Sequence, residues 1–314
     1  TSVPDSHTNL NTRAKDNGAL FVSLEDEEEE EFVELLRRTA ELVVRAERSA
    51  AHTLEAQEQR SPRKTNAKMR QAEEKEEAEL ASHLAIYEHF CERNAFSLIV
   101  NIVTGTAFQP ASKQVNKQVN TTMLPPLTIA TQAVQSVSIL IQNVSRVTSM
   151  YYLLSNNRIN DLIDFPLGLY SLAEQQLTIK RRLQSEGTTT TTPTSRKKTM
   201  VPDFSTPEMA ELSTHFVSFL KSLAMRMNAE TLQFFLSYPN EHNGSAGTDE
   251  DGSSNNNADE VEFPLYARAL EFCGSGHDHF VRVTAMNVCL NTLRLATVYD
   301  APLPENVMES GDQE

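Results

Sequence analysis

Apolar residues recur every three or four positions through most of this chain, which is the spacing of amphipathic helices. A predicted helix over 126–145 carries the clearest stripe, formed by Leu127, Ala130, Val134, Val137, Ile141 and Val144. Another, over 207–227, follows a capping hydroxyl at Thr206 and Pro207 at its first position. Asn228 ends that helix and can cap the next. No segment shows the alternation of a strand, so the pattern predicts an all-α chain of about eight to ten helices.

The segment Thr148–Tyr170 is too apolar for a surface loop and too interrupted for a membrane span. Four apolar residues end one predicted helix: Tyr151, Tyr152, Leu153 and Leu154. Residues 155–157 turn the chain, and the next helix brings further apolar residues from Ile159 onward. We interpret the segment as a buried corner between two packed helices.

Polar stretches separate the helices and set the predicted layout. We expect a disordered tail over 1–23, a helical domain over 24–298 and a second disordered tail over 299–314. Four polar or low-complexity insertions interrupt the domain, at about 49–79, 105–122, 184–205 and 240–260. The first of these reads as a solvated helix or a disordered insertion. The simplest architecture is an armadillo/HEAT-like α-solenoid of stacked helix pairs, and a closed bundle is the alternative.

The net charge of −15 is concentrated in three segments, 25–31, 73–79 and 244–262, and the remainder is nearly neutral. This acidity favours solubility and argues against nucleic-acid binding. The three cysteines are isolated and form no CxxC pair, which suits a reducing compartment and a cytosolic location. The most apolar run, Ala95–Val103, is about half as long as a bilayer span requires, and no signal peptide is evident.

Four blocks of sequence, in order, resemble those of a known family. They are Asn143–Ile163, His215–Phe235, Glu262–Phe272 and His279–Thr292. Together they resemble the FPL domain, the N-terminal module of the endosomal-maturation proteins, named after the tripeptide Phe263-Pro264-Leu265. The tripeptide alone is uninformative, since it recurs at Phe165-Pro166-Leu167.

The resemblance implies an armadillo-like fold and a role as a non-enzymatic scaffold or adaptor in endosome–lysosome membrane trafficking, autophagy and mitophagy. It implies a cytoplasmic protein, peripheral to endosome, lysosome or Golgi membranes, that reaches them through other proteins. Trafficking and tethering proteins or ubiquitin-ligase machinery are the expected partners. A regulatory subunit of a ubiquitin-ligase complex is therefore the alternative function.

Cys273, His277, His279 and Cys289 suggest a zinc site by residue type, and a metal-dependent enzyme there is a third hypothesis. Their spacing is poor, because 274–278 reads as a turn with Asp278 capping the last helix. The chain also lacks the HExxH, GxSxG, Walker and GxGxxG motifs. We therefore predict no catalytic residues, no cofactor and no metal.

Two polar helix faces are the candidate partner-binding surfaces. Asn287, Asn291 and Arg294 share one face of the last helix, at spacings of four and three residues. On the 126–145 helix a second face carries Gln135, Ser138 and Gln142. Rows of amides on solenoid helices can hydrogen-bond an extended peptide, and the alternative is an ordinary solvated face.

Overall fold

The computed structural model describes residues 19–59, 67–108, 122–155, 158–185, 204, 206–236 and 262–299. Helices dominate this part of the chain, as the sequence predicts. They are α1 (Asp26–Glu58), α2 (Ala67–Glu92), α3 (Ala95–Val103), α4 (Leu127–Asn143), α5 (Val147–Ser155), α6 (Arg158–Ile163), α7 (Leu167–Ser185), α8 (Pro207–Arg226), α9 (Pro264–Glu271) and α10 (His279–Tyr299). Two short 3-10 helices, η1 (Thr106–Phe108) and η2 (Leu232–Phe235), complete the set.

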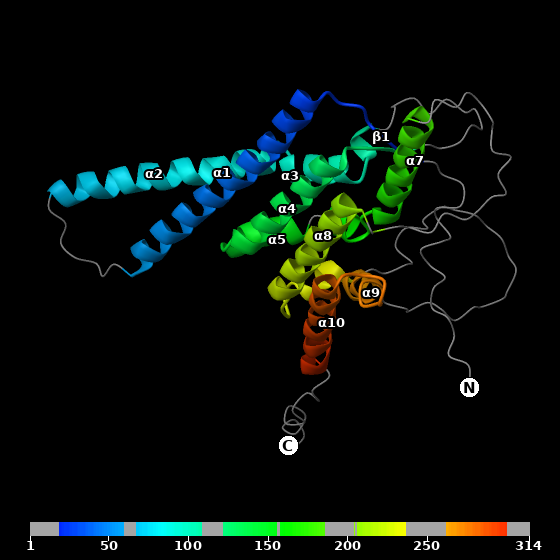
Figure 1. Ribbon diagram of the computed structural model, residues 1–314. Helices are drawn as coiled ribbons and strands as arrows, with labels where there is room; N and C mark the ends of the chain where they lie inside the picture. The colour runs from blue at the N-terminus through cyan, green and yellow to red at the C-terminus, as the bar shows by residue number, and fades with distance from the viewer. Residues whose placement is uncertain are drawn as a thin grey trace, which may run out of the picture.

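Five of the longer helices form a row in the order α2, α1, α4, α8, α10, and each packs mainly on the next. Figure 1 shows α8 lying between α4 and α10. The centre of the row is α4, whose apolar stripe is fully buried because α1 and α8 cover it from two sides. The all-α class is thus confirmed, while the regular pairing of an armadillo or HEAT repeat stays a prediction.

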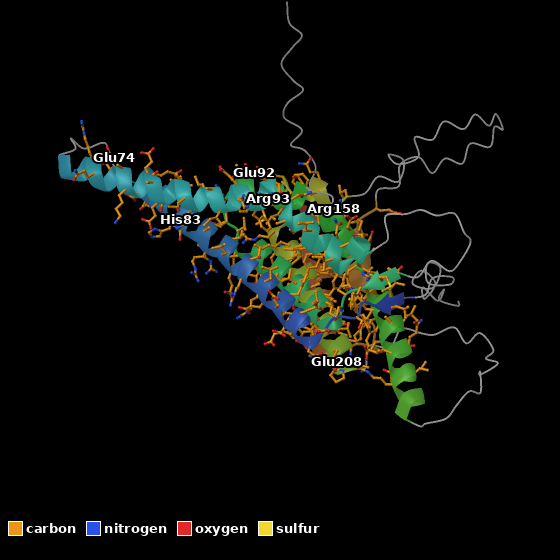
Figure 2. All side chains as sticks on the ribbon, turned by 90° about the horizontal axis from the view of Figure 1, so that it is seen from above. Glu74, His83, Glu92, Arg93, Arg158 and Glu208 are labelled. Atoms are coloured by element: carbon orange, nitrogen blue, oxygen red, sulfur yellow. The ribbon has the colours of Figure 1, made fainter. Side chains whose placement is uncertain are left out.

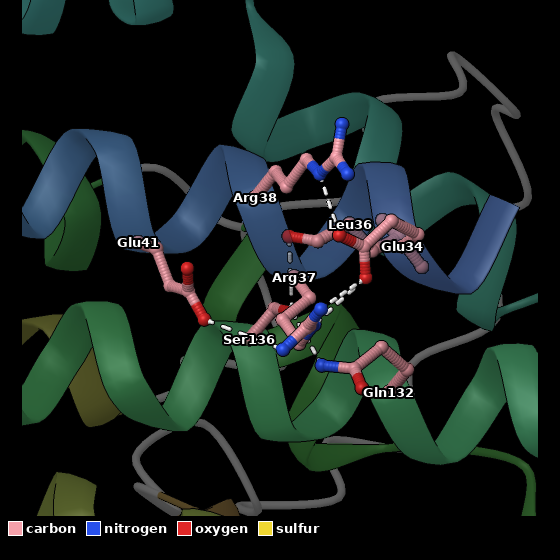
Figure 3. Close-up of polar contacts among 7 residues, drawn as sticks. All are labelled: Glu34, Leu36, Arg37, Arg38, Glu41, Gln132 and Ser136. Atoms are coloured by element: carbon pink, nitrogen blue, oxygen red, sulfur yellow. Dashed lines mark hydrogen bonds and ion pairs between the residues drawn. The ribbon is translucent and has the colours of Figure 1, made fainter. Parts of the chain in front are cut away.

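A buried polar contact joins α1 to α4 (Figure 3). The Ser136 hydroxyl of α4 donates to the Leu36 carbonyl of α1 over 3.3 Å, and the Gln132 amide donates to the same hydroxyl. Nearby, the Glu34 carboxylate accepts from Arg37 and Arg38 on the exposed side of α1. Helix α1 thus packs its apolar stripe on α4 and carries the Glu34 ion pairs on its exposed side.

A buried ion pair also crosses this region, between helices that are distant in sequence. The Glu47 side chain of α1 is 0% exposed, and its carboxylate accepts hydrogen bonds from Arg146 and, at 3.1 Å, from the Ser149 hydroxyl. The Arg146 guanidinium lies 5.4 Å from the centre of the Tyr87 ring of α2, and the Tyr87 hydroxyl donates to the Ser149 carbonyl. One carboxylate therefore ties α1 to the start of α5, beside α2.

Two predictions are wrong at residues 19–21. These residues were expected to belong to a disordered tail, and no strands were expected. Ala19–Phe21 forms a strand, β1, that pairs in parallel with β2, Thr122–Leu124. These three-residue segments are too short to show a period of two, so no alternation revealed them. Ala19 and Leu124 are fully buried, so the pair contributes to the core rather than to a tail.

The predicted insertion at 49–79 is partly described. Its described residues belong to the end of α1 and the first half of α2. The last turns of α1 and the first half of α2 project away from the row, with Glu74 near the free end and His83 closer to the body (Figure 2). The described part is therefore helical; it is mostly exposed over 73–79, whereas Ala50 in α1 is buried. The insertion at 240–260 lies outside the described residues, as do most of 105–122, most of 184–205 and the tail after residue 299.

The predicted corner within 148–170 is confirmed. Leu153 and Leu154 at the end of α5 are buried, as are the apolar residues of α6: Ile159, Leu162 and Ile163. Tyr151 and Tyr152 are only half-buried, because each hydroxyl reaches a polar partner: the Glu230 carboxylate and the Cys91 carbonyl, respectively. Among the described residues, no helix is long and apolar enough to cross a membrane.

Candidate partner-binding groove

The predicted polar face of α4 forms a seam with α8. The Gln135 amide lies 2.6 Å from His215 Nε2, and the Gln142 amide donates to the Ser222 hydroxyl over 2.6 Å. Ser138 is buried, and its hydroxyl donates to the Val134 carbonyl one turn earlier in its own helix. Gln135 and Ser138 therefore serve contacts within the chain, and only Gln142 at the end of the seam is exposed.

An open groove of about 560 Å³ begins where this seam ends. Gln142 of α4 contributes to its lining, together with residues of α8 and the first turns of α10. The remaining lining residues are Ser218, Lys221, Ser222, Met225, Arg226, Phe280 and Thr284. A volume of this size is within the range of sites that hold small molecules or a few side chains of a partner.

Two apolar side chains from different helices stand at the groove and are exposed to solvent. Met225 is 68% exposed and Phe280 is 53% exposed. Both lie outside the buried stripes of their helices. Bulky apolar groups that converge on a polar groove are a common feature of protein-recognition surfaces.

Both charged groups in the lining are cations. Arg226 donates to the carbonyls of Ile141 and Gln142 at the C-terminal end of α4, where a cation is favoured by the helix dipole. Lys221 is exposed and makes no hydrogen bond or ion pair with the part of the chain that the structure describes.

The predicted amide row on α10 continues from this groove. Asn287 and Asn291 follow Thr284 by three and seven residues, so they lie on the same side of the helix. Asn287 is exposed and Asn291 is half-buried, whereas Arg294 is exposed and has its own interaction within the chain. Of the predicted residues, only Gln142 lines the groove; Asn287, Asn291 and Arg294 lie further along α10 than the lining residue Thr284.

Of the residues considered for zinc, His277 packs against aromatic rings and the two cysteines interact with each other. The His277 ring packs against Phe272 and Phe204, with ring centres 5.0 and 5.5 Å away, and burial lowers the pKa of His277. Burial raises the pKa of the Cys289 thiol to about 12, with a further contribution from Cys273. Among the described residues, no group of three or more His, Cys, Asp or Glu side chains is placed to hold a metal ion.

Sequence reasoning missed most of the groove: Ser218, Lys221, Ser222, Met225, Arg226, Phe280 and Thr284. One signal was available, since Met225 and Phe280 are apolar residues that fall outside the core-facing stripes of their helices. Nothing in the sequence indicates that α4, α8 and α10 meet at one groove.

Comparison with known proteins places these helices in a family. The family model FPL, described as an uncharacterised conserved protein, matches residues 79–293. The chain belongs to the FPL family. The match covers α3 to α9, the second half of α2 and α10 up to residue 293, and so it includes every residue that lines the groove.

FPL relatives with curated names are similar over much of this chain. Protein CLEC16A of Mus musculus and of Homo sapiens is each 24% identical over 212 residues, which is 68% of this chain and 13% of theirs. A Protein CLEC16A homolog of Caenorhabditis elegans is 25% identical over 164 residues, or 52% of this chain and 12% of its own. The chain thus matches only about an eighth of the length of these relatives. No solved structure matches it.

The FPL tripeptide itself has a structural role in this chain. Phe263 precedes α9, Pro264 occupies its first position and Leu265 is fully buried. The second FPL tripeptide also stands at the start of a helix, although α7 begins at Leu167 and not at the proline. Arg268 of α9 links the two, since its guanidinium donates to the Phe165 carbonyl over 2.6 Å.

Proposed function

We propose that this FPL chain is a non-enzymatic helical scaffold that holds a protein partner in the groove between α4, α8 and α10. The observation that carries the proposal is the lining, in which exposed Met225 and Phe280 stand beside Lys221 and the Gln142 amide. Apolar groups rimmed by polar and charged ones suit a protein interface. Burial raises the pKa of the Cys91 and Cys289 thiols, which disfavours either cysteine as a nucleophile.

The proposed cellular setting is endosome–lysosome membrane traffic and autophagy, including mitophagy, at the cytoplasmic side of these membranes. This setting rests on the resemblance of the four sequence blocks to the endosomal-maturation proteins; the FPL match and the relatives named Protein CLEC16A support the family membership that it assumes. Membrane recruitment would then be peripheral and would depend on the partner.

The test is proximity labelling in cells with the tagged chain and two paired variants. Met225→Ala with Phe280→Ala removes the apolar groups of the groove, and Asn287→Ala with Asn291→Ala removes the amide row. Leu35→Ala with Leu42→Ala on α1 is the matched control, because both leucines are exposed apolar residues far along the row.

We expect the wild type to label endosomal tethering and autophagy proteins, and the groove variant to lose that labelling while the α1 control keeps it. Labelling dominated by a ubiquitin ligase and its regulators would favour the alternative function, a ligase subunit. A neighbour list that is identical for all variants would contradict partner binding at the groove.

A further inference from the structure

We infer that the groove recognises an acidic peptide segment carrying one bulky apolar side chain. This inference rests on the proposed scaffold function and adds the chemistry of the partner. Three properties of the groove carry it: its charge, its exposed apolar side chains and its unused hydrogen-bonding groups.

The charge of the groove is opposite to that of the chain. The chain carries a net charge of −15, yet both charged lining residues, Lys221 and Arg226, are cations. Helix α10 brings no acid to the groove, since its sequence contains no aspartate or glutamate. The nearest acid in sequence, Asp278, is engaged at the start of α10, where it accepts from the Phe280 amide over 2.8 Å. A positive groove favours an acidic ligand and disfavours a basic one.

The two cations have different roles. Arg226 is held by the carbonyls of Ile141 and Gln142, so its charge has a fixed position at the end of α4. Lys221 is exposed and has no acid as a partner among the described residues. An incoming carboxylate would therefore pair with Lys221 without breaking an existing ion pair.

The exposed apolar side chains of the groove indicate that the ligand carries an apolar group as well as negative charge. Met225 and Phe280 come from different helices and face one groove, so a single apolar side chain can contact both. Methionine adapts its shape to such partners, and an aromatic ring supplies a large contact area. An acidic ligand without an apolar group would leave these contacts unmade.

The remaining lining groups match a peptide backbone. The Gln142 amide donates one hydrogen bond to Ser222 and keeps a second N–H and its oxygen for a ligand. Asn287 is exposed on the adjoining row and makes no hydrogen bond with the described part of the chain. Side-chain amides both donate and accept hydrogen bonds, as a peptide backbone does, whereas a fully ionised phosphate only accepts them.

The experiment is selection of peptides from a random display library on the full chain, followed by binding measurements with the selected consensus peptide labelled with a fluorophore. Lys221→Glu reverses the free charge, and Phe280→Ala removes an apolar contact. Lys75→Glu is the matched control, since Lys75 is an exposed lysine on the projecting part of α2. Vesicles containing phosphatidylserine provide a parallel sedimentation assay.

We expect selected peptides to be enriched in aspartate and glutamate beside a leucine, phenylalanine, isoleucine or methionine. Lys221→Glu and Phe280→Ala should each weaken binding by about tenfold or more, and added salt should weaken it further. Lys75→Glu should leave the affinity within about twofold of wild type. Unchanged melting temperatures would show that the variants fold.

Selected peptides without an acidic bias, or a consensus peptide that binds Lys221→Glu as well as wild type, would overturn the inference. So would a library that yields no binder, or binding to the vesicles that requires Lys221. Loss of cellular labelling in the groove variant, combined with a neutral or basic consensus, would reject the acidic ligand while leaving the scaffold function intact.

Discussion

Glu47 is a charged residue that is fully buried in the described part of the chain. Its carboxylate is removed from water and depends on Arg146 and Ser149 for its hydrogen bonds. Burying a charge is costly, so the pair adds little net stability compared with apolar groups of the same shape. Removing one partner is different, because it leaves the other charge buried and unpaired.

Glu47→Ala should therefore lower the free energy of unfolding by about 3–5 kcal/mol. Urea denaturation monitored by circular dichroism measures this. Glu34→Ala, which removes the exposed carboxylate beside Arg37 and Arg38, is the control and should have a much smaller effect. An equal decrease in the free energy of unfolding for the two variants would show that Glu47 contributes no more to stability than a surface acid.

Gly105 is the described glycine that the fold requires for conformational reasons. It follows α3 with φ +75°, and an added Cβ would lie 2.6 Å from the Met123 carbonyl oxygen of β2. Alanine would be strained there both by its backbone conformation and by this contact.

Gly105→Ala should cost about 2 kcal/mol or more of stability. Gly168→Ala in α7 is the matched control, because a Cβ at that position meets nothing within 4 Å. A helical glycine replaced by alanine should gain stability or leave it unchanged. A Gly105→Ala protein as stable as the control would contradict the strained junction between α3 and β2.

Helix α5 makes contacts on two sides, with the end of α2 and with η2. Tyr152 reaches the end of α2 through the Cys91 carbonyl, and the Tyr151 ring lies 6.1 Å from that of Phe234 in η2. The apolar end of the helix, Leu153 and Leu154, is enclosed by the core. A short helix of this kind is held by its packing rather than by its intrinsic helix propensity.

Leu154→Asp should destabilise the protein by more than about 4 kcal/mol, because it buries an unpaired carboxylate. Tyr152→Asp should cost less, since the half-buried ring leaves that position access to water. Val147→Asp in the same helix is the control, as Val147 is exposed. A Leu154→Asp protein that melts within about 2 °C of wild type would reject the buried corner.

Two partly buried histidines, His215 in α8 and His277 just before α10, favour the neutral form. Burial lowers the pKa of His215 and of His277 below the ordinary value of 6.5, and Glu211, 3.9 Å from His215, opposes this only in part. The Gln135 amide donates to Nε2 of His215, which requires that nitrogen to be unprotonated. Below pH 6.5 the unfolded chain therefore binds more protons than the folded chain does.

Stability should accordingly fall as the pH drops from about 7 to 5, and it should not change through these groups above pH 7. The melting temperature measured across this range tests the sign. His215→Gln with His277→Gln should reduce the slope, because neither glutamine titrates. A double variant with the full wild-type slope would assign the pH dependence to other groups.

Local chemistry was sufficient to predict the helices. The spacing of apolar residues in α4, the Thr206–Pro207 start of α8 and the Asn228 oxygen that accepts from the Glu230 and Thr231 amides are all encoded within a few residues. Helical periodicity and end-capping are short-range effects, so the sequence alone carries them. The same holds for the corner at α5 and α6 and for the FPL resemblance.

The groove and the buried ion pair depend on residues that lie far apart along the chain. Glu47 and Arg146 are separated by 99 residues, and the Gln142–Ser222 contact spans 80. A sequence pattern shows that a face is polar but not whether another helix covers it. For this reason Gln135 and Ser138 proved to be interior contacts, whereas Gln142 lies at a groove: burial depends on which helices meet, and that is a property of the packed fold.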